Sequence, residues 1–117
     1  MRIFRRADLT THLITADDIT VLDSHRLLKN ALASWREGRV SRHAVCFSCK
    51  ASLADLDVEI GAYLFALPVN VDDLASTSAL CLECWDALSI DQRGLDAAAT
   101  RLLRQLLPGG RFLDQRS

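Results

Sequence analysis

The four cysteines of the chain form two identical C-x-x-C motifs, Cys46–Cys49 and Cys81–Cys84. Each motif presents two sulfurs from one short turn, so only the loop of residues 50–80 has to close to bring both pairs together. Four thiolates about 2.3 Å from one ion make a closed tetrahedral zinc site. The sequence therefore predicts one structural Zn²⁺ bound by Cys46, Cys49, Cys81 and Cys84.

Two other uses of such cysteines fit the sequence less well. Small iron carriers of the rubredoxin type also have two C-x-x-C motifs, but with glycine-rich turns and no helix entering from the second pair. A thioredoxin-like redox pair needs a βαβ frame, which the sequence does not indicate. His43, three residues before Cys46, is expected to be a polar neighbour at the rim, because four thiolates already complete the site.

Length and composition predict one domain spanning residues 1–117, because half of the 117 residues are apolar. The basic N-terminus is not followed by an apolar run, so no secretory signal is expected. The longest apolar run, Ala62–Leu67, is too short to span a bilayer. We therefore expect a cytoplasmic protein with no membrane contact, in a compartment where clustered cysteines are more often metal ligands than disulfides.

The net charge of -1 conceals an uneven distribution along the chain. Residues 1–50 carry nine Lys or Arg against five Asp or Glu, residues 51–90 carry none against seven, and residues 91–117 carry five against three. Four thiolates on one divalent ion add a charge of about -2 to this total. Such a field is unfavourable for binding nucleic acid.

Apolar periodicity predicts a helical segment in front of the first cysteine pair, over residues 15–38. Leu28, Leu32 and Trp35 recur on one face, and Gly38 ends the pattern. The helix is expected to start at Asp23 or Ser24. A longer version would start at Thr15, where the sequence resembles a capping box.

A second amphipathic helix is predicted over residues 90–107, after the last cysteine pair, followed by a tail of residues 108–117. Ser89 to Gln92 matches a capping box, and an apolar stripe follows that ends before Pro108. The stripe consists of Leu95, Ala99, Leu102, Leu103 and Leu106.

Between the cysteine pairs, Ala62–Leu67 reads as a buried strand that Ser76–Leu80 could pair with as a hairpin. Leu53, Leu56 and Ile60 have helical spacing but also suit an extended segment, so their structure stays open. The fold class expected is α+β and mostly helical, with a zinc module and a small hairpin packed between N-terminal and C-terminal amphipathic helices.

The second cysteine pair is followed by good helix formers, so Cys84 is expected in the first turn of a short helix. A first C-x-x-C in a turn, a hairpin and a second C-x-x-C that opens a helix resemble the treble-clef class of zinc modules. The resemblance covers residues 43–88 and concerns the fold type only. The chain departs from this class at Lys50, where glycine usually eases the tight turn after the first pair.

Basic residues precede and follow the first cysteine pair, namely Arg36, Arg39, Arg42 and Lys50. They could contact phosphate or an acidic partner. They could equally balance the excess charge of four thiolates on one zinc ion, and we favour this interpretation. His25 lies on the apolar stripe of the first helix and is expected at the boundary of the core.

The function expected is that of a small non-enzymatic zinc-binding adaptor or regulatory protein, which acts through a protein partner or through self-association. Four cysteines leave no open position for catalysis, and no small-molecule substrate is evident. Surplus apolar side chains would provide the docking surface, for instance Phe4, Trp35, Trp85, Leu103 or Phe112. The alternative is a nucleic-acid-associated zinc-finger regulator that uses the Arg36–Lys50 patch, and a weaker one is a thiol redox or metal-sensing switch.

Overall fold

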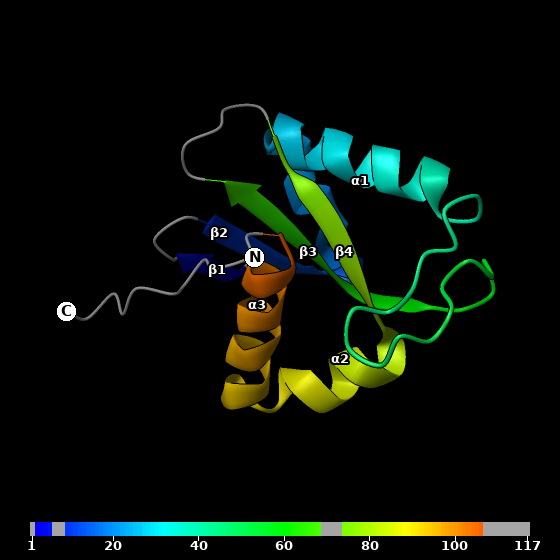
Figure 1. The fold of residues 1–117 in the computed structure, drawn as a ribbon. Coiled ribbons are helices and arrows are strands. Elements are labelled where there is room, and N and C mark those ends of the chain that lie inside the picture. The colour runs from blue at the N-terminus through cyan, green and yellow to red at the C-terminus, as the bar shows by residue number, and fades with distance from the viewer. Residues whose placement is uncertain (1, 6–8, 69–73, 107–117) are drawn as a thin grey trace.

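The fold is an antiparallel sheet with helices on both faces (Figure 1). A computed structural model describes residues 2–5, 9–68 and 74–106. In chain order the elements are β1 (Arg2–Arg5), β2 (Leu9–Thr15), the 3₁₀ helix η1 (Ala16–Ser24), α1 (Arg26–Gly38), β3 (Ile60–Pro68), β4 (Ser76–Cys81), α2 (Leu82–Ser89) and α3 (Gln92–Leu106).

The sheet has the strand order β1-β2-β3-β4, and each neighbouring pair is antiparallel. In the central pair, Leu13 of β2 lies opposite Leu64 of β3. The chain between β2 and β3 leaves the sheet, forms η1, α1 and a long loop, and then returns beside β2. The first cysteine pair lies in this loop, so the sheet topology brings it back toward β4.

Strand β3 is buried on both faces, from Gly61 to Ala66. Successive side chains of a strand point to opposite faces. Tyr63 packs against Trp35 of α1 with 5.7 Å between ring centroids. Figure 1 shows α2 and α3 on the other side of the sheet from α1. A strand covered on both faces is apolar throughout, which explains why this segment was predicted correctly as a buried strand.

The helix predicted before the first cysteine pair is confirmed as α1, with Leu28 and Leu32 buried on its inner face. It begins at Arg26 with His25 as its N-cap, so the predicted start at Asp23 or Ser24 is one to three residues too early. Both of those residues belong to a separate 3₁₀ helix that ends at Ser24, so the longer version is not a continuous α-helix. At the start of η1 the hydroxyl of Thr15 donates to the carboxylate of Asp18 at 2.9 Å.

The last helix is also confirmed, although its first turn is capped differently from the prediction. Asp91 precedes α3, and its carboxylate accepts a hydrogen bond from the amide of Arg93 at 3.0 Å. Ser89 instead donates to the carbonyl of Asp86 in α2. Leu95 and Ala98 are buried, whereas the side chains predicted to continue the stripe, Ala99, Leu102, Leu103 and Leu106, and the tail 108–117 lie outside the described residues.

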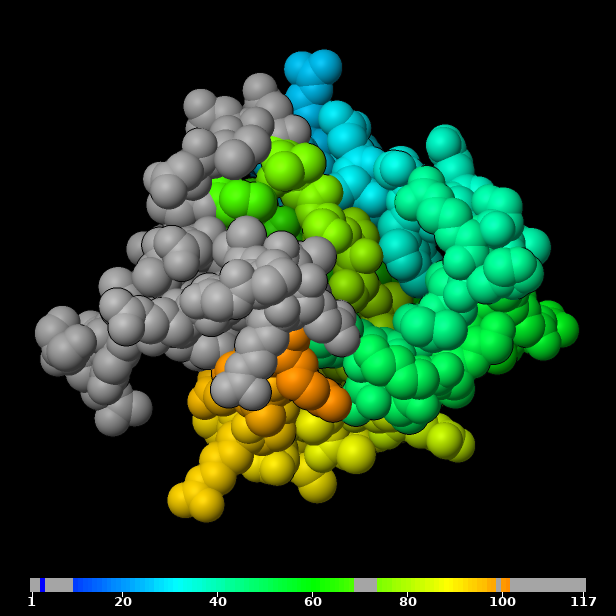
Figure 2. Space-filling model, viewed as in Figure 1, coloured from blue at the N-terminus to red at the C-terminus, as the bar shows by residue number. Residues whose placement is uncertain are grey.

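The undecided stretch around Leu53 and Leu56 is irregular loop rather than helix. Leu53 is fully buried, Leu56 is 68% exposed, and Ile60 begins β3. Figure 2 shows this loop, coloured cyan-green to green, on the flank of the molecule between α1 and α2.

The sheet is larger than the small hairpin expected from the sequence. The hairpin of β3 and β4 is present and lies between α1 and the last two helices, but β1 and β2 extend it. The mostly helical composition is therefore not confirmed. Strand β2 escaped prediction because its sequence, LTTHLIT, has neither a continuous apolar run nor a regular alternation of apolar and polar residues, and even its polar Thr11 is fully buried. Its β-branched residues were the available signal.

Candidate metal centre

The first cysteine pair lies in a miniature hairpin of residues 44–53. The amide of Cys46 donates to the carbonyl of Ala51 at 2.8 Å, and the amide of Leu53 donates to the carbonyl of Ala44 at 2.7 Å. The turn closes with a hydrogen bond from the amide of Lys50 to the carbonyl of Cys46. Lys50 has a φ of 65°, so the non-glycine residue noted in the sequence adopts the left-handed conformation that glycine favours.

This hairpin is attached to the edge of the sheet beside β4. The amide of Phe47 donates to the carbonyl of Ala79 at 2.8 Å, and Cys46 forms a parallel bridge with the same residue. Ala79 lies two residues before Cys81 on β4. These backbone contacts thus place the first cysteine pair next to the second.

The second pair lies where β4 ends and α2 begins. Cys81 is the last residue of the strand and the N-cap of the helix, and Cys84 lies in the first turn of the helix. This is the arrangement predicted from the helix formers that follow Cys84. The amide of Leu82 donates to the carbonyl of Glu59 at 3.1 Å, which fixes the start of the helix against the chain entering β3.

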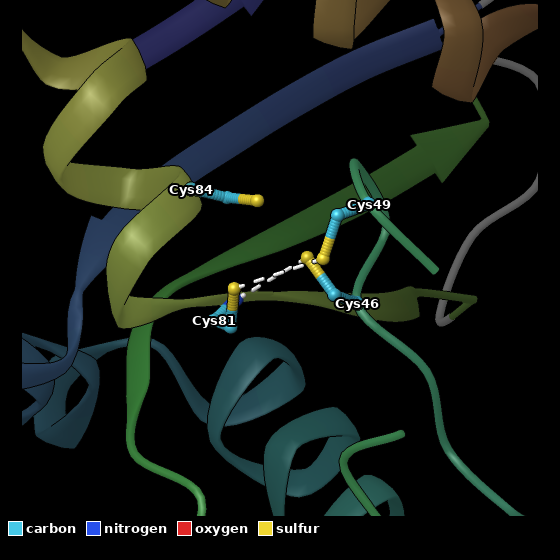
Figure 3. Close-up of side chains that lie close together, drawn as sticks. All are labelled: Cys46, Cys49, Cys81 and Cys84. Carbon is cyan, nitrogen blue, oxygen red and sulfur yellow. Dashed lines mark hydrogen bonds between the residues drawn. The ribbon is translucent and has the colours of Figure 1, made fainter. Parts of the chain in front are cut away.

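The four sulfurs converge on one point (Figure 3). The Sγ atoms of Cys46, Cys49, Cys81 and Cys84 all lie within 4.8 Å of one another, and those of Cys49 and Cys81 are 3.9 Å apart. A tetrahedral zinc–thiolate site has sulfurs about 3.8 Å apart, because each Zn–S bond is about 2.3 Å long. All four cysteines are free thiols. The donor set and its spacing therefore fit a single metal ion.

Burial and hydrogen bonding set the protonation of the sulfurs. Burial opposes ionisation of Cys46, but the amides of Cys49, Cys81 and Ser48 outweigh it and lower the pKa of Cys46 to about 7. The amide of Cys81 donates to this sulfur at 3.4 Å. Burial raises the pKa of Cys81. Burial, reinforced by hydrogen bonds among the sulfurs, raises the pKa of Cys84 to about 12.

Burial is the main reason why the pKa values of Cys81 and Cys84 are raised. Repulsion from the charge of an ionised Cys46 raises them further, so these two thiols keep their protons. A divalent cation at the centre of the four sulfurs would reverse this balance by stabilising all the thiolates.

The four cysteines differ in their access to solvent. Cys46 is fully buried and Cys81 is 8% exposed, whereas Cys49 lies at the surface. Cys49 is therefore the sulfur through which a metal or a thiol reagent would first reach the site.

The histidines lie outside the cluster of metal-ligand atoms that the described residues contain. His43 is exposed, with a φ of 52°, which agrees with its predicted place at the rim. His25 is half-buried at the N-cap of α1, as expected for a residue at the boundary of the core.

The structure gives the residues of the predicted basic patch separate environments. Arg39 donates hydrogen bonds to the carbonyls of Leu53, Asp55 and Val58, and its guanidinium lies 5.8 Å from the ring of Trp35. Arg36 lies 5.8 Å from the ring of Tyr63, and Arg42 donates to the carbonyl of Ser34. Lys50 lies over the ring of Phe47. All four residues thus contact the protein's own chain, and the hydrogen bonds of Arg39 hold the loop in place.

Sequence reasoning missed the link between the first cysteine pair and α3. Phe47 is 5% exposed, and its ring lies 5.3 Å from the ammonium of Lys50 and 5.5 Å from the guanidinium of Arg101. Arg101 is an exposed residue of α3, whereas Phe47 lies between the first two cysteines. The contact joins residues far apart in the chain, so helical periodicity alone could not have indicated it.

No family model, no curated protein and no solved structure matches this chain. Among the described residues, no helix combines the length and the apolar character needed to cross a bilayer. The site's own geometry therefore carries the functional argument.

Proposed function

We propose that this protein is a small non-enzymatic zinc-binding module that acts by binding another protein, with the zinc ion in a structural role. The observation that carries the proposal is the convergence of four sulfurs, from two distant segments, to within 4.8 Å of one another. A miniature hairpin, a strand hairpin and a helix opened by the second pair also follow one another in the order typical of treble-clef modules.

Zinc is the metal that this donor set favours. Four thiolates in tetrahedral reach suit zinc, whereas magnesium and calcium prefer oxygen ligands. A four-sulfur coordination sphere is closed, so the ion would have no position for substrate or activated water. The ion would instead stabilise the fold by fastening the loop of the first pair to β4 and α2.

The contacts of Arg39 favour the protein-binding role over the nucleic-acid alternative. Arg39 is one residue of the predicted basic patch, and its guanidinium donates hydrogen bonds to three backbone carbonyls. A phosphate contact there would have to displace those hydrogen bonds. A protein partner makes no such demand, and the surface offers exposed apolar side chains for it, including Leu56 and Leu82.

Native mass spectrometry of the purified protein tests the metal proposal. We expect one zinc ion per chain, lost in the double variant Cys49→Ser/Cys84→Ser and retained in the control Ser48→Ala from the same turn. Three outcomes would contradict the proposal: the protein contains no metal even when the cells are grown with added zinc, it contains iron instead of zinc, or the double variant retains its zinc.

Association is tested by light scattering and by pull-down from a native extract. We expect a protein partner or a dimer that is lost when a chelator removes the zinc. If the zinc-loaded protein instead retains DNA or RNA in a salt-dependent way, the protein-binding role is wrong and the nucleic-acid alternative replaces it.

A further inference from the structure

A groove of about 600 Å³ lies where the loop before β3, the start of η1 and the helix α2 meet. Its volume falls in the range typical of ligand sites, about 300–1,000 Å³. Tyr63 and Trp85 line it, and no cysteine of the candidate metal centre does. It is therefore a surface separate from the metal centre.

Exposed apolar side chains occur on both sides of this groove. Leu56, from the loop, is 68% exposed, and Leu82, from the first turn of α2, is 38% exposed. The half-buried Trp85 lies one turn further along α2. Large apolar side chains left in solvent beside an aromatic ring are typical of a contact surface for another protein.

Carboxylates from three different elements surround the same groove. Asp17 comes from η1, Glu59 from the chain entering β3, and Asp86 from α2, and all three are exposed. None of them forms an ion pair with a side chain in the part of the chain that the structure describes. Among the described residues that line the groove, Arg39 is the one cation, and backbone carbonyls hold it. The groove thus has an excess of unpaired negative charge.

The walls of the groove are held together before any partner arrives. The amide of Leu82 donates to the carbonyl of Glu59, which ties α2 to the opposite wall. Gly61 lies so close to α2 that a Cβ added to it would be 2.4 Å from the Cβ of Trp85. A preformed surface loses less entropy on binding than one that must be ordered.

We infer that this groove binds a peptide segment of a partner protein in which Lys or Arg side chains flank a large apolar side chain. The cationic side chains would pair with Asp17, Glu59 and Asp86, and the apolar one would cover Leu56 and Leu82. A guanidinium over the ring of Trp85 would add a cation–π contact. The inference rests on the proposed protein-binding function and specifies its surface and its partner chemistry.

Selection from a display library of short random peptides against the zinc-loaded protein tests this chemistry. We expect enrichment of peptides with at least two Lys or Arg residues around a Leu, Met or aromatic residue. Binding of the best peptide should weaken about tenfold when NaCl is raised from about 50 to about 300 mM, because exposed charge pairs are screened. Selection of acidic or uncharged peptides, or no enrichment, would overturn the inference.

A matched pair of double variants tests the location. Glu59→Lys/Asp86→Lys reverses two groove charges, while Glu37→Lys/Glu83→Lys makes the same change in net charge at exposed positions that do not line the groove. We expect the groove double variant to weaken binding of the selected peptide by about tenfold or more, and the control double variant to weaken it by less than about twofold. Equal effects of the two pairs would contradict the assignment.

Leu56→Ser tests the apolar half of the site and should also weaken peptide binding, because it removes an apolar contact. The substitution should leave folding unchanged, because this side chain is exposed. Zinc content and circular dichroism are measured for every variant. They distinguish a variant that has lost only peptide binding from one that no longer folds.

If the folded, zinc-loaded protein selects no basic peptide, the groove inference is wrong but the metal proposal still stands. If light scattering shows a dimer that Glu59→Lys/Asp86→Lys dissociates, the occupant is a second copy and the inference is wrong.

Discussion

Lys50 stands where the turn after the first cysteine pair favours glycine. Its φ of 65° places a side chain in the left-handed region, which costs a non-glycine residue about 1–2 kcal/mol. The ammonium lies 5.3 Å from the ring of Phe47, and a cation–π contact at an exposed site returns about 0.5–1 kcal/mol. The residue therefore combines backbone strain with a compensating side-chain contact.

Replacing Lys50 with glycine should stabilise the protein slightly. We expect Lys50→Gly to raise the free energy of unfolding by about 0.5–1 kcal/mol, because the relief of strain exceeds the lost contact. Lys50→Ala, which keeps the strain and loses the contact, serves as the control and should destabilise. Urea unfolding of the zinc-loaded proteins measures both, and a loss of stability in Lys50→Gly would contradict the argument.

Arg39 is predicted to act on stability rather than on a ligand. Its guanidinium bonds to the carbonyls of Leu53, Asp55 and Val58, so Arg39→Ala should cost about 2 kcal/mol of unfolding free energy. Arg39→Lys should lose about half of this, because an ammonium cannot reproduce the planar fork. The control Arg42→Ala removes one long hydrogen bond to Ser34 and should change stability by less than about 0.5 kcal/mol. Thermal and urea unfolding would show whether this order holds.

The protonation of the sulfurs predicts how zinc affinity depends on pH. In the metal-free protein the pKa values of Cys81 and Cys84 are raised, and that of Cys46 is lowered to about 7. Zinc must displace a proton from all three thiols below pH 7, but only from Cys81 and Cys84 above it. These thiols alone should make the affinity rise about 1,000-fold per pH unit below pH 7 and about 100-fold per unit just above it.

Competition with a chromophoric chelator between about pH 6 and pH 8 measures this dependence. Cys46→Ser should remove the break in slope near pH 7 if zinc still binds. An affinity that does not change with pH would show that the thiols are already ionised in the metal-free protein.

At the scale of elements, the start of α3 shows how a correct helix can have an incorrectly predicted cap. The motif from Ser89 to Gln92 suggested that the serine caps the helix, but α2 extends through Ser89, whose hydroxyl bonds within that helix. Asp91 is the residue directly before α3, and its carboxylate accepts the hydrogen bond from the amide of Arg93. Two helices in direct succession moved the cap by two residues.

The cap can be tested by single substitutions. Asp91→Ala should lower the free energy of unfolding by about 1 kcal/mol, because the amide of Arg93 loses its acceptor and the helix dipole loses a compensating charge. Asp91→Asn should retain most of the stability, and Ser89→Ala should have little effect. Urea unfolding compares the three variants, and a larger cost for Ser89→Ala than for Asp91→Ala would restore the original capping box.

At the scale of the whole molecule, the four cysteines join parts of the fold that the sheet alone does not hold. The first pair lies in the long connection between β2 and β3, and the second joins β4 to α2. Backbone hydrogen bonds from Cys46 and Phe47 already guide the hairpin to its place. A metal ion would add a crosslink that lowers the entropy of the unfolded chain.

Removing the metal should therefore destabilise the protein without erasing its sheet. We expect a strong zinc chelator to lower the melting temperature by about 10 °C or more, which corresponds to about 2 kcal/mol or more in a domain of this size. Hydrogen exchange should accelerate most in residues 44–53 and in α2, and least in the β2–β3 ladder. A variant with all four cysteines changed to serine provides the control, since its melting temperature should not respond to the chelator.

Some features of this protein followed from local sequence alone. The spacing of Cys46, Cys49, Cys81 and Cys84 predicted four sulfurs in one place, and the apolar stripes predicted α1 and α3, because each signal repeats within a few residues. The continuous apolar run predicted β3 for the same reason. None of these inferences required knowledge of which distant residues meet.

Only the tertiary structure decided the features that depend on distant partners. Strand β2 is recognisable once β3 lies beside it, Arg39 becomes structural once the loop carbonyls reach it, and the groove exists only where three separate elements meet. Such contacts depend on the path of the chain between them, which no local pattern contains. The physical reason is that burial and charge pairing are properties of neighbours in space, whereas periodicity and motif spacing are properties of neighbours in sequence.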